Sequence, residues 1–408
     1  MKSLNTMVSL RYTAYKATVA VLSLLGPVNA PALEWRNGDW QVHGFLSQGF
    51  TYTDHNQVFG TSEDGSLDFR EMGLNGSVKL LPNLLISAQG LYRDAGASDD
   101  MGTRLDFAQV DYSSPLLDST LVLGVRGGRV KVPFGLYNDT RDVLSTRPSV
   151  LLPQSIYFDT LALRQAMISA DGGVMYSRYT YGEHRFGLEL MTAEPRDGTG
   201  GATVFLTGIP GAQGELGGRP MFIGRAAYEW MGGRGRLMFS IVDLDRDFRS
   251  ASTVAPSGNI KVQYPLFSAQ YNAEHWSLTG EYGWIDSQRK GFMPVTLKNT
   301  SENFYLQGEY RFTQAISGVL RYDVFHVDRN DRDGKSLSRM TGLPRHQFYA
   351  RDLTTGVRWE FAHNFLLAAD YHYINGTAWL NTTDNPDLLS GVGDSDWNLF
   401  TTMLSFRF

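Results

Sequence analysis

The sequence contains no cysteine, and after residue 32 it contains no apolar run long enough to cross a bilayer as a helix, which takes about 20 residues. The first absence excludes disulfide frameworks, thiolate metal sites and cysteine nucleophiles. The motifs G-x-S-x-G and H-E-x-x-H and the Walker loop are also missing, and none of the eight histidines has a second histidine four positions on. We therefore predict no enzyme and no metal or cofactor site.

Acidic residues are missing from the first 32 positions, which carry three basic residues. The apolar run 17–25 follows the basic residues, and Ala30-Pro31-Ala32 has the A-x-A form of a cleavage site. This layout predicts a secretory signal peptide over residues 1–32, with an amphipathic N-terminal helix as the alternative. Without the three positive charges of this leader, the formal charge of −5 becomes −8, which argues against a nucleic-acid partner.

The remaining residues, 33–408, alternate between apolar and polar side chains with a period of two. In one segment Phe304, Leu306 and Tyr310 share a face, while Glu309 and Arg311 lie on the other. The side chains of a β-strand point alternately to its two sides. A soluble sandwich would show the same alternation, but segments of about ten residues with aromatic residues near their ends are typical of a barrel that spans lipid.

Sixteen such segments predict an all-β fold, a transmembrane antiparallel β-barrel. They begin near residues 40, 67, 83, 103, 119, 172, 184, 219, 234, 260, 274, 300, 315, 350, 364 and 396. Short turns alternate with long loops, which cover about 54–66, 94–102, 130–171, 194–218, 245–259, 287–299, 328–349 and 376–395. This asymmetry is typical of outer-membrane barrels and predicts that both termini lie on the periplasmic side. The segments near 103 and 234 break the alternation, so we expect β-bulges there.

The third long connection, residues 130–171, is rich in apolar residues, which would find no burial on an outer surface. We therefore expect it to fold inward, pack against the barrel wall and narrow the lumen. Its charged residues are candidates for the pore constriction: Lys131, Arg141, Arg147, Arg164, Asp139, Asp142 and Asp159. Charged residues on inward strand faces are candidates for the pore wall: Arg126, Arg178, Arg225, Arg311, Arg321, Arg358, Glu281, Glu309 and Glu360.

Basic residues prevail in this loop, with five cations against three anions between positions 129 and 164. Rings of cationic side chains favour anions in pores. We therefore expect a mild anion preference, unless the cations pair with neighbouring carboxylates. Pairing of Arg141 with Asp139 or Asp142 would remove it.

Two segments resemble known families. Phe408 is the last residue and shares its face with Phe406 and Leu404, which resembles the assembly signal of Gram-negative outer-membrane barrels. Residues 128–136, GRVKVPFGL, are similar to the G-x-x-K-x-P-F segment of phosphate-selective porins, although residues 137–142 depart from that family. In sixteen-stranded porins the third loop also narrows the pore. The resemblance implies an outer-membrane porin that contacts bilayer lipid and lipopolysaccharide, is inserted by the barrel-assembly machinery and forms a homotrimer.

The sequence thus favours a passive diffusion channel for small hydrophilic solutes or ions. One alternative is a binding or adhesion barrel with a closed lumen and no conductance. The other is a barrel hydrolase that places a histidine and a serine or aspartate at its outer rim. Fold alone does not decide among these functions.

Overall fold

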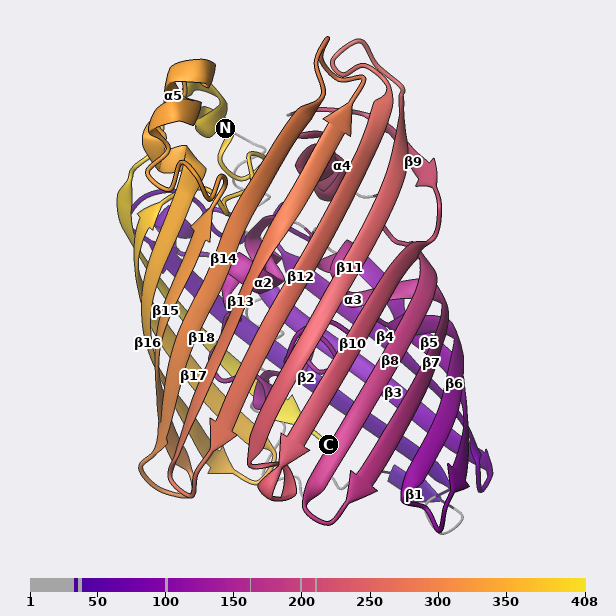
Figure 1. Cartoon of the computed structure of the whole chain (residues 1–408). Coiled ribbons are helices and arrows are strands. Elements are labelled where there is room, and N and C mark those ends of the chain that lie inside the picture. Colours follow the sequence, from indigo (N-terminus) through magenta and orange to yellow (C-terminus); the bar gives the residue numbers. More distant parts are fainter. Residues whose placement is uncertain (1–32, 36–38, 100–101, 162, 199, 210) are drawn as a thin grey trace, which may run out of the picture.

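The computed structural model describes residues 33–35, 39–99, 102–161, 163–198, 200–209 and 211–408. They form one sheet of 18 strands, in which each long strand pairs antiparallel with its neighbours along the chain. The last strand pairs with the first long one, Phe406 opposite Leu46, so the sheet closes into a barrel (Figure 1). Two short strands, β1 (Leu33–Trp35) and β9 (Gly214–Gly218), extend its edges, and the other 16 make the wall. The predicted signal peptide lies outside the described residues.

The wall strands are β2 (Trp40–Thr53), β3 (Phe69–Leu81), β4 (Leu84–Ala95), β5 (Gly102–Leu116), β6 (Leu121–Lys131), β7 (Ser169–Tyr181), β8 (His184–Pro195), β10 (Met221–Trp230), β11 (Gly235–Ser250), β12 (Gly258–Asn272), β13 (Trp276–Lys290), β14 (Leu297–Arg311), β15 (Ile316–His326), β16 (Tyr349–Ala362), β17 (Phe365–Gly376) and β18 (Asp396–Arg407). The helices lie between them: η1 (Ser62–Asp64), η2 (Leu144–Thr146), α2 (Gln154–Tyr157), η3 (Asp159–Leu161), α3 (Arg164–Ile168), α4 (Gly200–Thr207), η4 (Met231–Gly233), α5 (Lys335–Thr341), η5 (Arg345–Phe348) and η6 (Pro386–Ser390).

The predicted sixteen-stranded antiparallel barrel is confirmed, and the short and long connections gather at opposite ends (Figure 1). We call these the turn end and the loop end. One expected bulge is present in β5, because Gln89 pairs with Phe107 while Gly90 pairs with Leu105, which leaves Asp106 out of register. The second expected bulge is wrong, because β11 pairs with β12 without a shift from Gly235 to Phe248.

The outer face of the wall is apolar, as a lipid-facing surface requires. Alternate residues of β16 illustrate it, since Leu353, Val357 and Trp359 are each about half exposed. Exposed aromatic residues cluster near the turn end, among them Tyr181 and Phe312, which suits a girdle at a membrane interface. Among the described residues, no helix has the length and apolar character to cross a membrane.

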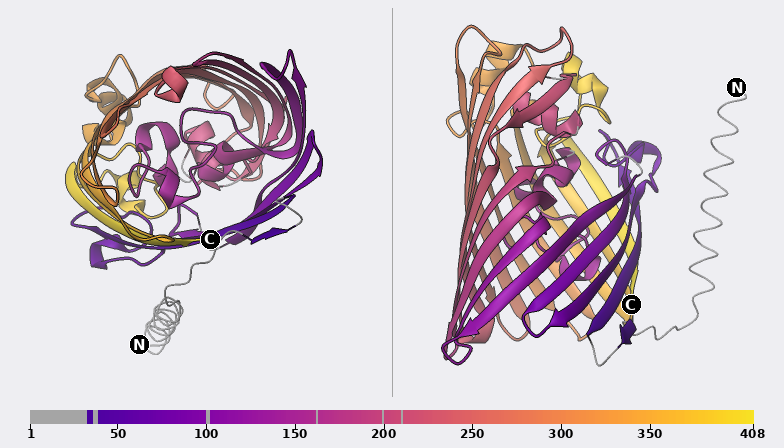
Figure 2. Two further views of the ribbon diagram at one scale, coloured as in Figure 1. Left: turned by 90° about the horizontal axis from the view of Figure 1, so that it is seen from below. Right: turned by 90° about the vertical axis from the view of Figure 1, so that its right-hand side faces the viewer.

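The third connection, residues 132–168, runs inside the barrel (Figure 2). Its apolar residues are buried, as the sequence predicts; Leu144, Val150, Ile156 and Tyr157 have no exposed surface. They join residues from strands around the wall in one core cluster, including Tyr264 of β12. The interior of this barrel is therefore a packed assembly of loop and wall over much of its height.

Candidate functional site: the third loop and the cavities beside it

The third loop begins with a sharp bend at Pro133-Phe134-Gly135. Gly135 has a φ of +60°, and a Cβ there would lie 2.7 Å from the Tyr157 hydroxyl, so the position favours glycine. The same hydroxyl accepts hydrogen bonds from the backbone N–H groups of Leu136 (3.1 Å) and Tyr137 (3.0 Å). Tyr157 of α2, itself a residue of the third loop, therefore holds the first residues of the loop in place.

Glu281 of β13 anchors this bend to the wall. Its Oε2 accepts a hydrogen bond from the Tyr157 hydroxyl (2.7 Å), and its Oε1 accepts one from the Leu136 N–H (3.0 Å). Ser268 and Tyr305 donate to the same carboxylate at 2.6 and 3.0 Å. A buried carboxylate with this many donors is satisfied without a cationic partner.

Wall carboxylates on β15 and β17 hold the middle of the loop. Asp370 Oδ2 accepts hydrogen bonds from the backbone N–H groups of Val150 (2.6 Å) and Leu151 (3.3 Å). Asp323 accepts one from the N–H of Ser155 (3.3 Å). These two carboxylates satisfy loop N–H groups that would otherwise be buried without partners, which fixes the height of the loop in the lumen.

Arg321 of β15 also holds the loop, as a donor of hydrogen bonds to a loop hydroxyl and a loop carbonyl. Its Nη1 donates to the Ser149 hydroxyl at 2.8 Å and to the Leu151 carbonyl at 3.1 Å. The side chain is 1% exposed. This predicted pore-wall residue therefore faces inward, and its guanidinium binds the third loop.

A buried ion-pair network fastens the loop to β3, β4 and β5. Glu71 of β3 lies within 3.0 Å of Arg93, 2.5 Å of Arg147 and 3.6 Å of Arg164. Arg93 also pairs with Asp99 at 3.0 Å. Glu71 thus joins two loop arginines to a wall arginine in a region without solvent access.

The network continues through the acidic residues of the loop. Asp142 pairs with Lys131 and Arg164, and Lys131 also pairs with Asp106, the bulged residue of β5, at 2.5 Å. Asp159 pairs with Arg141 at 2.5 Å and with Arg164 at 3.3 Å. In total, six cations face five carboxylates: Arg93, Arg104, Lys131, Arg141, Arg147 and Arg164 against Glu71, Asp99, Asp106, Asp142 and Asp159.

These ion pairs shift the pKa values of carboxyls in the network. Burial alone would raise the pKa of Asp142, but Lys131 and Arg164 outweigh it and hold that pKa well below its usual range. Burial is likewise overcome at Asp99, where Arg93 and Arg104 lower the pKa to about 2. Both carboxyls therefore stay ionised at neutral pH.

The predicted constriction residues thus lie between loop and wall. Arg141, Arg147 and Arg164 are 0–3% exposed, and their charges are matched by carboxylates. Arg141 pairs with Asp159, a carboxylate other than Asp139 and Asp142, which were named as the partners that would remove the anion preference. Asp139 instead pairs with the wall residue Arg225 at 2.7 Å and is partly exposed. The buried loop cations therefore stabilise the position of the loop through ion pairs.

Two other predicted wall residues, Arg126 of β6 and Arg225 of β10, pair with carboxylates of neighbouring strands. Arg126 pairs with Asp111 (3.0 Å) and Glu189 (3.3 Å), and Arg225 also pairs with Glu189. Arg126 and Arg178 lie over the ring of Tyr176, with centroid distances of 4.5 and 5.0 Å. The charges of Arg126 and Arg225 are thus balanced by carboxylates of neighbouring strands.

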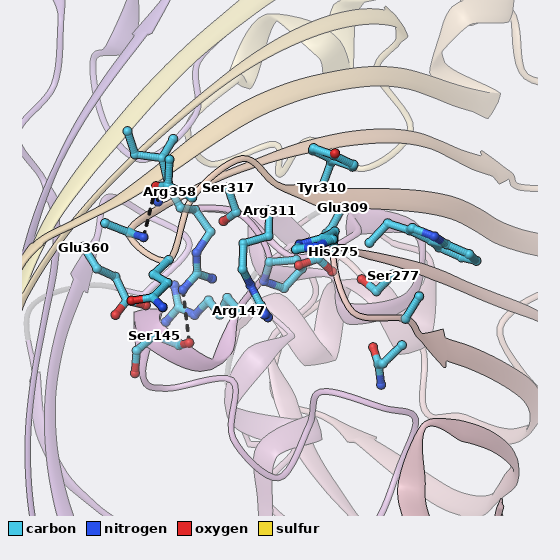
Figure 3. Close-up of a pocket in the computed structure, with 18 of the residues that line it drawn as sticks. Ser145, Arg147, His275, Ser277, Glu309, Tyr310, Arg311, Ser317, Arg358 and Glu360 are labelled. Carbon is cyan, nitrogen blue, oxygen red and sulfur yellow. Dashed lines mark hydrogen bonds between the residues drawn. The ribbon is translucent and has the colours of Figure 1, made fainter. Parts of the chain in front are cut away.

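The remaining predicted wall residues line a cavity of about 380 Å³ at the turn end (Figure 3). Arg311, Arg358, Glu309 and Glu360 come from β14 and β16, and Arg147 faces them from the third loop. Arg311 and Arg358 donate to the backbone carbonyls of Glu274 (3.4 Å) and Ser145 (3.1 Å). Among the described residues, neither arginine has a carboxylate within ion-pairing distance.

Two further cavities lie on the other side of the loop and are lined mostly by apolar residues. The inner chamber, about 120 Å³, is bounded by loop residues such as Phe134 and Phe158 and by inward residues of β10 to β13. The outer chamber, about 340 Å³, reaches the loops that follow β15 and β17. Neither chamber shares a lining residue with the turn-end cavity. The sequence reasoning missed both chambers.

The C-terminal residues that resemble an assembly signal close the barrel. Phe408 exchanges two backbone hydrogen bonds with Gly44 of β2, at 3.0 and 3.1 Å. Its ring covers Gly44, where a Cβ would lie 2.5 Å from the ring. Phe406 packs against Phe365 with a centroid distance of 5.0 Å, and Leu404 pairs with Gln48 of β2. Recognition of these residues during assembly stays a prediction.

Known proteins resemble this chain in structure only. No family model matches the sequence, and no curated protein matches it. An anion-selective porin from Comamonas acidovorans is 14% identical with a TM-score of 0.56, over 90% of this chain and 99% of that one. OmpF of Salmonella typhi, in complex with daunomycin, is 15% identical with a TM-score of 0.55, over 92% and 100%. The outer-membrane channel DcaP of Acinetobacter baumannii is 11% identical with a TM-score of 0.56, over 92% and 99%. These likenesses show a shared fold, and the resemblance of residues 128–136 to phosphate-selective porins stays a prediction.

Proposed function

We propose that the chain is a porin-type channel of a Gram-negative outer membrane, with both termini on the periplasmic side. The observation that carries the proposal is the arrangement of the lumen. A closed barrel with an apolar outer belt holds a charged cavity at its turn end, chambers at its loop end, and an internal loop between them. Solutes would cross down their gradient, and the third loop would limit their size.

The proposed passage is narrow, because the third loop fills much of the cross-section. Its backbone is held by Asp370 and Asp323 on one side and by the Glu71 network on the other. A packed interior has few voids larger than a water molecule. We therefore expect a conductance well below that of a barrel whose lumen holds only water, with brief larger openings when the loop moves.

We further propose that a mild anion preference arises in the turn-end cavity and not at the loop cations. Ion pairs cancel the field of Lys131, Arg141 and Arg164. The side chains of Arg311 and Arg358 bond to backbone carbonyls and, in the described part of the chain, to no carboxylate. Fixed charges in a narrow, low-dielectric space act strongly on permeating ions. Glu309 and Glu360 line the same cavity, which keeps the preference mild.

A planar-bilayer recording of the refolded chain 33–408 under a KCl gradient tests this proposal. We expect discrete current steps and a reversal potential that favours chloride. The double substitution of Arg311→Gln and Arg358→Gln should move the reversal potential toward potassium, and Arg185→Gln, which changes an exposed arginine elsewhere at the turn end, should not. A chloride preference that survives the double substitution would contradict the assignment to this cavity.

A second candidate, a binding barrel with a closed lumen, is favoured by one observation. Val150, Ile156 and Tyr157 are fully buried, so this part of the lumen is filled by protein. Such a barrel would insert and fold normally but give no current steps. Folded protein that never conducts would select this function over the channel.

The homotrimer implied by the porin resemblance is also proposed, and its interface is placed at a hollow of about 810 Å³ on the outer face. There the small residues Ala226, Ala269 and Gly280 interrupt larger apolar side chains. Small residues let neighbouring segments approach closely within lipid. Ala269→Trp should dissociate the oligomer in an unheated gel, whereas Val357→Trp, on the exposed face of β16, should leave it intact. An unchanged oligomer in the first variant would place the interface elsewhere.

A further inference from the structure

The two loop-end chambers form one apolar tract along the inner wall. Both are lined by Phe205 and Leu206 of α4 and by Val262 and Ile285 of β12 and β13. Inward residues deeper in the barrel extend the apolar lining to β10 and β11; they are Met221, Ile223, Val242 and Leu244. The tract therefore runs from the outer loops down to the third loop.

This lining differs from that of a water-filled pore, whose inward-facing residues are polar. Water gains little in a space with apolar walls, whereas an apolar solute gains free energy by leaving water for it. Asp197, a carboxylate that lines the inner chamber, is paired with Arg246 at 2.8 Å. The tract thus favours a ligand with an apolar chain.

A cation stands at the outer end of the tract. Arg289 of β13 lines the outer chamber and donates to the carbonyls of Leu206 (2.6 Å) and Phe205 (3.1 Å) at the end of α4. Within the described ranges, no carboxylate lies within ion-pairing distance of this guanidinium. A charge-assisted hydrogen bond to an anionic ligand is therefore available there.

An unpaired polar atom stands at the inner end. Tyr264 of β12 is 5% exposed and lines the inner chamber, and its hydroxyl has no hydrogen-bond partner in the described part of the chain. A buried hydroxyl without a partner costs free energy, so the site gains when a ligand supplies one. The pairs Gln263–Asp286 and Leu266–Gly283 place Tyr264 level with residue 285, four residues from Arg289, which corresponds to about 13 Å along the strand.

We propose that the tract is a binding site for an elongated apolar carboxylate that carries a hydrogen-bonding atom at its far end. The carboxylate binds Arg289, the apolar chain lies against Val262 and Ile285, and the far atom bonds to the Tyr264 hydroxyl. This site lies on the loop-end side of the third loop. The proposal concerns binding, so it stands independently of whether the barrel conducts.

Calorimetric titration of the full barrel in nanodiscs with 10-hydroxydecanoate tests the site, with empty nanodiscs subtracted for partitioning into lipid. An extended ten-carbon chain covers a distance comparable to that between the two anchors. We expect saturable binding with one ligand per chain. The neutral 10-hydroxydecanamide should bind about tenfold more weakly or worse, because it lacks the charge that Arg289 recognises. No saturable binding, or equal affinity for acid and amide, would overturn the proposal.

Two substitutions then assign the anchors. Arg289→Gln should weaken binding of the acid by about tenfold or more and remove its advantage over the amide. Arg185→Gln, which changes an exposed arginine at the turn end, should bind like the unaltered protein. Because Arg289 also holds α4, the melting temperature of the Arg289→Gln variant is measured first. If that variant fails to fold, the comparison of acid and amide on the unaltered protein decides whether the site recognises the carboxylate. Tyr264→Phe should remove the preference for 10-hydroxydecanoate over decanoate. A preference that persists would overturn the inner anchor.

Discussion

Replacing Glu71 with glutamine should release the third loop from the wall. The carboxylate is fully buried and pairs with Arg93, Arg147 and Arg164. Glutamine has the same shape, so the change removes charge and little else. The three arginines around it, which are 0–3% exposed, then lose a negative charge that no solvent replaces.

The expected loss can be sized from buried ion pairs. Removing one partner of such a pair costs about 3–5 kcal/mol, because the other charge is left buried and uncompensated. The barrel strands keep their ladder of hydrogen bonds, so the cost falls mainly on loop docking. An equilibrium between docked and released loop would shift by roughly a hundredfold to several thousandfold.

The assay is single-channel current of Glu71→Gln beside the unaltered protein, together with thermal unfolding of both. We expect a larger and noisier conductance and a lower unfolding temperature. Glu183→Gln is the matched control, because Glu183 lies exposed in the turn between β7 and β8 and, in the described structure, forms no ion pair. Unchanged conductance and stability in Glu71→Gln would refute the claim that the network holds the loop.

Further predictions concern single features of the loop and its network. The pKa of Asp99, lowered to about 2 by Arg93 and Arg104, should add about 2 kcal/mol of stability above pH 4 that is lost as the pH falls toward 2. The difference in unfolding free energy between the unaltered protein and Asp99→Asn should shrink over that range, and a constant difference would contradict the assigned ion pairs. Gly135→Ala should cost about 1–3 kcal/mol, since its φ is positive and its Cβ would meet the Tyr157 hydroxyl. Gly187→Ala, where the nearest atom is 3.8 Å from the added Cβ, is the control, and equal stability of the two variants would argue against the bend.

The strands and the inward loop were predictable because each follows from local sequence. Alternation with a period of two marks a strand that faces lipid on one side and the lumen on the other, as at 304–312. The loop's apolar residues demanded burial, and the lumen was the available place. Asp106 broke the alternation because it occupies a bulge.

The partners of the loop charges could not be predicted, because they come from distant strands. Arg147 pairs with Glu71, 76 residues away, and Val150 bonds to Asp370, 220 residues away. A single sequence does not indicate which of many inward carboxylates meets which loop group. It therefore predicted cations facing water where the fold provides neutralised pairs.

The apolar chambers did leave a signal in the sequence. Residues 237–242 of β11, LMFSIV, are mostly apolar on both faces, and such a run indicates a strand buried on both sides. Leu237 and Phe239 face lipid, while Val242 lines the inner chamber. A run of this kind in a membrane barrel thus marks a part of the lumen that packs against protein or an apolar ligand.

Osmotic swelling of liposomes that contain the refolded barrel tests the central claim most directly. Solutes of increasing size, from arabinose to raffinose, would be supplied outside vesicles loaded with a larger polymer. The account predicts swelling with the smallest solutes and a sharp fall with size, because the third loop leaves a narrow passage. Vesicles that show no swelling with any solute, although the inserted protein is folded, would contradict the channel and leave a closed barrel.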